Sequence, residues 1–224
     1  MLSTANRADE KVTIIGDDHR KLVERIVAVI LIATLGEIKM KGVIFTAFLD
    51  HVETELGLEM VDRIIESSEL STGGAYTAVG TYDHSELVQM VVNLSEFTKI
   101  PIPDLLKGFG LKLFSQLADS YAGLLGDASD SFSLVSSIDN HIHIEVRKLY
   151  PDADLPKFSH ERIDNDNLVL TYTSDRGFAD VAEGLLMGCF AYFKEEIEID
   201  REDLGGGTGK HVRFHLKRKG LGDE

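Results

Sequence analysis

The sequence predicts an α+β fold, in which helices fill the first two thirds of the chain and a smaller mixed unit follows. Three observations support this class. Apolar residues recur every three or four positions over most of the stretch before Pro151, which is typical of amphipathic helices. Short alternating segments after Pro156 indicate paired strands. A further helical pattern, rich in Ala and Leu, lies between those strand pairs and completes the α+β order.

The helical part is expected to hold several amphipathic helices separated by glycine, proline or polar breakers. Asp83 or Ser85 is a candidate N-cap for one of them. Pro101 and Pro103 disfavour helix before them, so that helix should end near residue 98. The expected helices are residues 43–56, 58–67, 81–98, 103–126 and 132–150.

The last third of the sequence is predicted to form two strand pairs with a helix between them. Residues 158–176, "FSHERIDNDNLVLTYTSDR", indicate two strands around an Asp-Asn turn. Residues 177–196 have a helical pattern, and residues 197–219 indicate two strands around the glycine-rich turn "GGGTG".

The composition is that of a globular protein with an acidic surface. The 224 residues are 43% hydrophobic and 27% charged, which is enough for one sizeable core. The formal net charge is -15, and all of the excess acid lies from Met40 onward. An acidic surface disfavours sequence-independent binding to nucleic acid or to an anionic membrane, but it suits a basic protein partner. We therefore expect neither a nucleic-acid partner nor a membrane partner.

The single cysteine indicates the cellular compartment of the protein, and the N-terminal segment indicates where its domain begins. Cys189, in an apolar run, cannot form an intrachain disulfide and is expected to be a small core residue. Few cysteines and no secretory signal favour the cytoplasm. The apolar run Ile26–Gly36 is too short for a membrane span of roughly 20 residues. Since Met40 opens an amphipathic helix, we expect an extension over residues 1–39, one domain over 40–219 and a tail over 220–224.

Two histidines, His141 and His143, lie two residues apart in "NHIHIEVRKLYP". On a strand they would share one face and could bind one metal ion. On a helix they would point about 200° apart, so only one could face a given site. Apolar residues recurring from Phe132 to Leu149 favour the helix. The alternative is that both are surface or core-edge residues, but histidine is a common metal ligand, so a metal site at one of them stays open.

The segment "YTSDR" is a second candidate binding element. On a strand, Tyr172, Ser174 and Arg176 would lie on one face, and all three side chains can donate hydrogen bonds. The arginine fork binds carboxylates with two parallel hydrogen bonds, so the triplet would suit a ligand with two carboxylates. The alternative is an ordinary exposed polar strand face.

Three segments, "MKGVIF", "IHIEVRKLYPDADLP" and "YTSDR", occur in the order and rough spacing of the heme–nitric oxide/oxygen-binding (H-NOX) family. From Met40 to about Lys219 the chain resembles a stand-alone bacterial member. The resemblance implies heme b as the cofactor, with His143 as the proximal iron ligand and His141 in no required role. It further implies heme contacts from Tyr172, Ser174 and Arg176 at the propionates, from Pro156 pressing on the ring, and from Ile44 on the distal side.

The resemblance also implies which gas is bound. Oxygen-binding members place a distal tyrosine nine residues past the first tyrosine of the signature, and this chain has Val181 there. Other positions aligned with the distal wall, Phe48, Leu113 and Leu117, are also apolar. Without a donor, bound oxygen loses its main stabilisation, whereas nitric oxide binds ferrous heme strongly without one. We therefore expect a nitric oxide sensor that excludes oxygen.

The family mechanism implies a switch without catalysis. Nitric oxide weakens the bond from iron to His143, and its rupture frees the helix that carries His143 and lets a distorted heme relax. A partner protein reads the change in trans; stand-alone bacterial members typically regulate a histidine kinase or a cyclic-di-GMP enzyme. The alternatives are an oxygen-binding or redox heme sensor, a peroxidase-type heme enzyme, which needs distal polar groups, and a non-heme metalloprotein using both histidines, which needs the strand.

Overall fold

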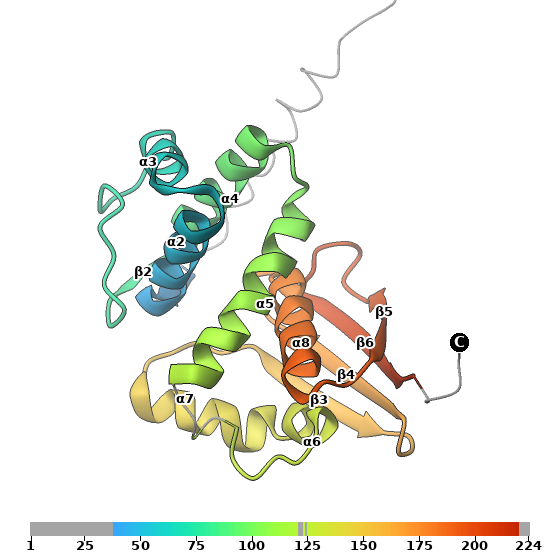
Figure 1. The fold of residues 1–224 in the computed structure, drawn as a ribbon. Coiled ribbons are helices and arrows are strands. Elements are labelled where there is room, and N and C mark those ends of the chain that lie inside the picture. Colours follow the sequence, from blue (N-terminus) through green and yellow to red (C-terminus); the bar gives the residue numbers. More distant parts are fainter. Residues whose placement is uncertain (1–37, 121–122, 124, 220–224) are drawn as a thin grey trace, which may run out of the picture. The chain divides into compact units, whose positions relative to one another are not determined.

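The computed structural model describes residues 38–120, 123 and 125–219, and the fold of this part is α+β, as predicted (Figure 1). The segments expected as an extension and a tail, including the apolar run Ile26–Gly36, lie outside the described residues, apart from Ile38 and Lys39. These two residues take part in the fold. The backbone N–H of His84 donates to the Ile38 carbonyl at 3.0 Å, and Lys39 pairs with Asp83 across two strands.

The N-terminal subdomain, residues 38–98, is helical with one short antiparallel strand pair. Within the segment expected to be helical over residues 81–98, the helix begins at His84, and the predicted N-cap at Asp83 is confirmed. The Asp83 carboxylate accepts a hydrogen bond from the Ser85 N–H at 2.9 Å and caps the helix, while the residues just before it pair with a distant strand. The elements are β1 (Lys39–Lys41), α2 (Gly42–Leu56), α3 (Leu58–Glu66), β2 (Thr81–Asp83) and α4 (His84–Thr98).

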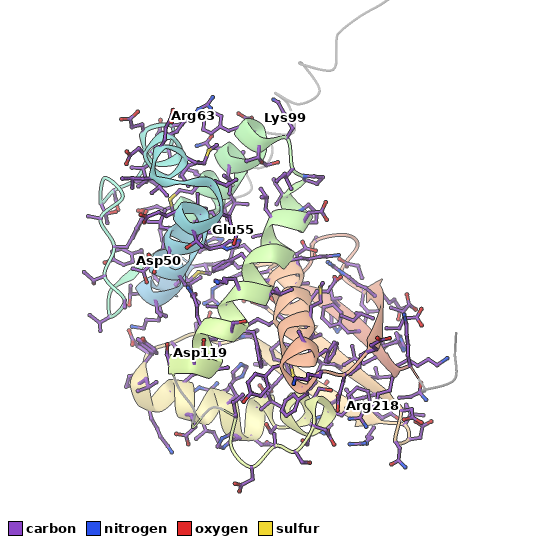
Figure 2. All side chains as sticks on the ribbon, viewed as in Figure 1. Asp50, Glu55, Arg63, Lys99, Asp119 and Arg218 are labelled. Carbon is purple, nitrogen blue, oxygen red and sulfur yellow. The ribbon has the colours of Figure 1, made fainter. Side chains whose placement is uncertain are left out.

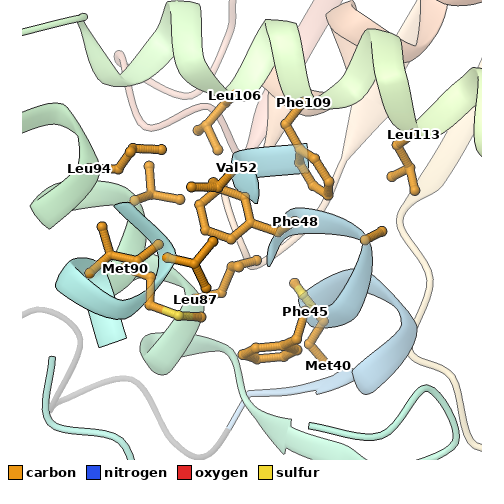
Figure 3. Packing of buried hydrophobic residues seen from close by; sticks show 14 residues of the cluster. Met40, Phe45, Phe48, Val52, Leu87, Met90, Leu94, Leu106, Phe109 and Leu113 are labelled. Carbon is orange, nitrogen blue, oxygen red and sulfur yellow. The ribbon is translucent and has the colours of Figure 1, made fainter. Parts of the chain in front are cut away.

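The apolar faces of α2 and α4 meet the first half of a long helix, α5 (Ile102–Ser120), in one core (Figure 3). Phe48 of α2 packs edge-to-face on Phe109 of α5, with ring centroids 5.5 Å apart. Such a pair adds about 0.5–1.5 kcal/mol beyond the burial of its area. This cluster, here called the N-terminal core, also includes Phe45, Val52, Leu87, Met90, Leu94, Leu106 and Leu113.

The C-terminal subdomain, residues 102–219, combines helices with a four-stranded antiparallel sheet of order β3-β4-β6-β5. The two predicted strand pairs and the helix between them are confirmed. The helix expected over 103–126 is shorter, and the one expected over 132–150 is divided into three helical pieces. After α5 the elements are α6 (Ser131–Ser136), η2 (Ile138–Ile142, a π-helix), α7 (His143–Leu149), β3 (Lys157–Arg162), β4 (Asn167–Thr173), α8 (Ala179–Phe193), β5 (Ile197–Asp203) and β6 (His211–Arg218).

A second core lies where α6 and α8 pack with the sheet. Leu168 and Leu170 of β4 and Phe214 of β6 form it together with Phe190 of α8. Cys189 is part of this core, as expected, and burial raises the pKa of its thiol to about 12, so the thiol stays protonated and unreactive at neutral pH. In the described residues no helix is long and apolar enough to cross a membrane.

Helices α5 and α8 cross at very short range because glycines face each other (Figure 1). A Cβ atom on Gly110 of α5 would lie 2.3 Å from the Val181 carbonyl oxygen, and one on Gly184 of α8 would lie 2.1 Å from the Lys107 carbonyl oxygen. Backbone at these distances leaves no room for any side chain. The crossing joins the N-terminal core, through α5, to the helix that covers the sheet.

Glu86 of α4 fastens the connection between α3 and β2. Its buried carboxylate accepts hydrogen bonds from the Ser71 hydroxyl and from the Tyr76 hydroxyl, each at 2.6 Å. Burial and the bond to Glu86 raise the pKa of Tyr76, so its proton stays in place. A single carboxylate therefore holds two points of an otherwise irregular segment.

Replacing Glu86 with alanine is expected to lower the free energy of unfolding by about 3–6 kcal/mol, since hydrogen bonds to charged groups contribute ~1.5–3 kcal/mol each and two hydroxyls lose their acceptor. Urea unfolding followed by circular dichroism measures this. Tyr76→Phe removes only the bond from the Tyr76 hydroxyl and leaves both bonds from Ser71, so it should cost less. Equal stability of Glu86→Ala and the wild type would show that the segment does not depend on Glu86.

Candidate functional site

The histidine pair lies on helical backbone, so the helical interpretation is confirmed. His141 is the next-to-last residue of η2 and His143 begins α7. The two histidine rings lie in different surroundings. Nε2 of His141 is 2.8 Å from the Gly123 carbonyl oxygen, whereas His143 is buried, with 8% of its surface exposed. The strand that a shared metal ion would need is absent there. The non-heme hypothesis required that strand, so it is wrong.

His143 is held by a carboxylate that the sequence reasoning missed. Its Nδ1 lies 2.6 Å from Oδ1 of Asp139, four residues earlier on the helix. Burial lowers the pKa of His143, with Asp139 acting in the opposite direction, so the ring is neutral at pH 7. With Nδ1 occupied, Nε2 is the nitrogen that can bind a metal ion, and a neutral imidazole oriented by a carboxylate is the usual form of a protein ligand.

Tyr172 and His143 both pack against the ring of Phe158, which lies between them. Phe158 of β3 packs against His143, with centroids 5.8 Å apart, and against Tyr172 of β4, with centroids 5.4 Å apart. Burial raises the pKa of Tyr172, and hydrogen bonds from Ser174 and the Phe178 backbone oppose this. The phenol is therefore neutral. Tyr172 lies near the end of β4, next to the loop that contains Ser174.

The signature triplet differs from the predicted strand face. Strand β4 ends at Thr173, so Ser174 and Arg176 lie in the following turn and not on the strand. The turn still gathers the three residues, because the Ser174 hydroxyl interacts with Tyr172 and accepts from the Arg176 backbone N–H at 3.3 Å. The alternative of an exposed polar face is wrong as well, since Tyr172 is 2% exposed and the Arg176 side chain 7%.

Arg176 has one buried hydrogen-bond donor, Nε, that is unpaired within the described residues. Its Nη2 donates to Asp154 at 2.7 Å and to the Lys39 carbonyl at 3.0 Å, but its Nε is buried with no hydrogen-bond partner in the described residues. A buried unsatisfied donor on a charged group is costly, by about 1–3 kcal/mol or more. An anionic ligand at Nε would remove that cost, which is the chemistry a carboxylate of a cofactor supplies.

The residues expected on the distal side gather in one apolar cluster. Phe48 of α2 and Leu113 of α5 are buried in the N-terminal core, and Ile44, Leu117 and Val181 pack against that core while partly exposed. Three helices, α2, α5 and α8, thus contribute to the same apolar wall. Pro156, directly before β3, is half-buried.

Two tyrosines near this wall have their hydroxyls engaged elsewhere. Tyr76 and Tyr82 both pack against the N-terminal core. The Tyr76 hydroxyl donates to Glu86, and the Tyr82 hydroxyl accepts from the Thr77 backbone N–H at 2.9 Å. The Tyr76 hydroxyl therefore cannot donate to a small ligand without breaking its bond to Glu86, and the Tyr82 hydroxyl also lies 3.2 Å from the Thr77 hydroxyl.

Sequence reasoning missed Asp139, Asp154 and Phe158 as parts of the site. A spacing of four residues before His143 was a usable signal for Asp139 once the segment was taken as helical. Asp154 contacts Arg176 across 22 positions of sequence, and no local pattern marks such a pair.

A buried neutral histidine, a donor triplet with a spare guanidinium nitrogen and an apolar wall together define a heme-binding gas-sensor class of protein. Comparisons with known proteins agree. A family model described as "Haem-NO-binding" matches residues 41–201. The chain belongs to this family, the H-NOX proteins, whose members bind heme, sense gases and are not enzymes, so the peroxidase-type alternative is excluded.

Solved structures of H-NOX proteins superpose on this fold. The Fe(II) unliganded H-NOX from K. algicida is 44% identical, with a TM-score of 0.77, over 81% of this chain and 97% of that chain. The Fe(II)NO H-NOX from S. oneidensis is 30% identical, with a TM-score of 0.75, over 81% of this chain and all of that chain (100%). The IWP-051-bound Fe(II)CO H-NOX from Shewanella woodyi is 44% identical, with a TM-score of 0.71, over 83% and 97%. A search of curated proteins gave no match.

Proposed function

We propose that this chain is a heme-based nitric oxide sensor that signals to a partner protein in trans. The observation that carries the proposal is the pairing of a buried neutral histidine, held by Asp139, with a buried and unsatisfied donor on Arg176. The first suits an iron atom and the second suits a propionate. The sensing domain would comprise residues 40–219 together with Ile38 and Lys39, which bond to His84 and pair with Asp83, and the residues before them would be an extension. A cytoplasmic location fits the single buried cysteine.

Heme b is the proposed cofactor, and each group of residues has a part in holding it. Nε2 of His143 would bind the iron, the side chains of Tyr172, Ser174 and Arg176 would hold the propionates, and Pro156 would press on the ring. When bound, the heme supplies a ferrous iron with one open position for a diatomic gas. The distal wall would be formed by Ile44, Phe48, Leu113, Leu117 and Val181.

An ion pair connects the loop that follows the helix of His143 to the N-terminal subdomain. Helix α7, which begins at His143, leads into a loop whose Asp152 pairs with Lys41 at 2.6 Å and whose Asp154 pairs with Arg176 at 2.7 Å. Lys41 is the last residue of β1 and directly precedes α2, which carries Ile44. Release of His143 from iron when nitric oxide binds would free α7, and these pairs would transmit its movement to α2.

A partner would read this change as a difference in its affinity for the two states. A histidine kinase or a cyclic-di-GMP enzyme is the proposed class. The acidic surface, where Asp50 and Glu55 of α2 and Asp119 of α5 are exposed (Figure 2), favours a partner with a basic docking surface.

Reconstitution of the heme-free chain with hemin tests the cofactor proposal. Absorbance at the heme band should saturate at one hemin per chain. After reduction under argon, nitric oxide should change the spectrum, while air should yield no lasting oxygen form. If the absorbance kept rising without saturating at a fixed ratio of hemin to protein, as in nonspecific adsorption, the result would count against heme binding.

The apolar distal wall predicts a gain of oxygen binding in Val181→Tyr. A phenol at this position could donate to bound oxygen, and one hydrogen bond of about 1.4 kcal/mol corresponds to a tenfold slower loss of oxygen. Stopped-flow absorbance after mixing the ferrous protein with air-saturated buffer measures this. Val181→Phe, which has the same ring without the hydroxyl, is the matched control. If the wild type already retained oxygen, or if both variants behaved alike, the role assigned to the missing donor would be wrong.

A further inference from the structure

Asp139 uses both oxygens of its carboxylate. Oδ1 lies 2.6 Å from Nδ1 of His143, and Oδ2 accepts a hydrogen bond from the backbone N–H of Phe158 at 3.0 Å. Phe158 belongs to β3, which lies at the edge of the sheet and is paired only with β4. One side chain thus connects the candidate iron ligand to an otherwise unpaired amide of the sheet.

A π-helical turn brings Asp139 to this position. The N–H of His143 donates to the Ile138 carbonyl, five residues back, where an α-helix would use the carbonyl of Asp139. The Ser137 carbonyl accepts from the N–H groups of both His141, at 2.7 Å, and Ile142, at 3.3 Å. Such widened turns are rare and often occur at functional sites, because they redirect the side chains around them.

We propose that Asp139 is a positioning residue that strengthens the bond from His143 to iron and fixes His143 to the edge of the sheet. This inference rests on the proposed heme-sensing function. It names a residue, outside the signature segments, that sets how readily the sensor switches.

The first contribution of Asp139 is electronic. Its Oδ1 accepts the proton of Nδ1, so His143 keeps the tautomer in which Nε2 is bare. A carboxylate acceptor is stronger than a neutral one and makes the imidazole a better electron donor to a metal ion. The iron–histidine bond is stronger for that reason.

The second contribution is mechanical. Oδ2 is bonded to Phe158, whose ring also packs on His143 and on Tyr172. Displacement of His143 must therefore strain or break contacts with a strand that is part of the four-stranded sheet. Both contributions favour the state with His143 on the iron, so loss of Asp139 should shift the balance toward release.

Asp139→Asn tests this with little change in shape. The single carbonyl oxygen of asparagine can accept from His143 or from Phe158, but its NH₂ group can accept from neither. In the reduced heme-loaded protein, the iron–histidine stretching band in resonance Raman spectra should move to lower frequency. Displacement of His143 by nitric oxide should become about tenfold faster or more, as is typical for loss of such a supporting bond.

Glu145→Gln is the matched control for charge. It removes one carboxylate from the same helix, where Glu145 bonds to Lys148 at 2.5 Å and does not contact His143. Its stretching band and nitric oxide kinetics should equal those of the wild type. Asp139→Glu retains the charge on a longer side chain, so its band should lie between those of the wild type and Asp139→Asn; this variant also serves if the asparagine variant does not fold.

A measurement without heme separates this inference from the proposed function. Nitrogen-15 spectra of the heme-free protein should show the Nδ1–H tautomer of His143 in the wild type and a mixture of tautomers in Asp139→Asn. An unchanged tautomer together with an unchanged stretching band would overturn the role of Asp139, even with His143 confirmed as the ligand. A stretching band that survives His143→Gly would instead overturn the proposed function.

Discussion

Replacing His143 with glycine is expected to remove the proposed bond between the protein and the heme iron. The ring of His143 is buried beside Phe158, so its loss leaves a cavity of imidazole size. Free imidazole should enter this cavity and restore the iron–nitrogen band in the reduced protein. Because the replacement ligand is not attached to α7, nitric oxide should no longer alter α7 or the response of a partner.

His141→Gly is the control for this experiment. His141 differs from His143 by two positions, but its ring contacts the Gly123 carbonyl. This variant should keep the iron–histidine band and the response to nitric oxide. The assignment of His143 would be wrong if His141→Gly lost the band, or if His143→Gly kept it without imidazole.

Replacing Gly184 with valine is expected to have the largest effect on stability. The first added atom would lie 2.1 Å from the Lys107 carbonyl oxygen and 2.9 Å from Cα of Gly110, so α5 and α8 would have to separate. Overpacking typically costs ~1–3 kcal/mol, and more where backbone must move, so we expect a loss of about 3 kcal/mol or more. Val181 on α8 and Leu113 on α5 would also move apart, and heme should be lost faster.

Thermal unfolding followed by circular dichroism measures the first effect, and transfer of heme to an apo-globin acceptor measures the second. Gly108→Ala is the matched control, because Gly108 lies on α5, the helix that Gly184 faces, with open space where the Cβ would be. It should leave heme retention unchanged and raise stability by up to about 1 kcal/mol through helix propensity. A Gly184→Val protein as stable as the wild type would show that the close crossing is not needed.

Local patterns were sufficient for most of the elements. The apolar spacing in α2 and α8 and the breakers around the two strand pairs lie within each segment, so these helices and strands match the predicted ones closely. Thr81–Asp83 shows the limit. These residues were taken as the start of a helix, but they pair with Lys39–Lys41, some 40 positions away, and only a tertiary contact decides between the two conformations.

The candidate site was predictable to the extent that it depends on signature residues. His143, Tyr172 and Arg176 were proposed from the sequence as site residues. The structure places His143 and Tyr172 against Phe158, and Arg176 in the turn after β4. Their supporting partners were not identified. Asp139 lies four residues before His143, a spacing that could have indicated the pair once the segment was taken as helical. Asp154 reaches Arg176 across 22 positions of sequence through the loop after α7, and no local pattern marks that contact.

The absorption spectrum of the reduced protein, recorded without oxygen before and after nitric oxide is added, is the most direct test of the proposed release of His143. We expect a five-coordinate ferrous heme with His143 bound, and then a five-coordinate nitrosyl heme from which His143 has been released. A nitrosyl heme that stays six-coordinate, with His143 still on the iron, would contradict the proposed switch.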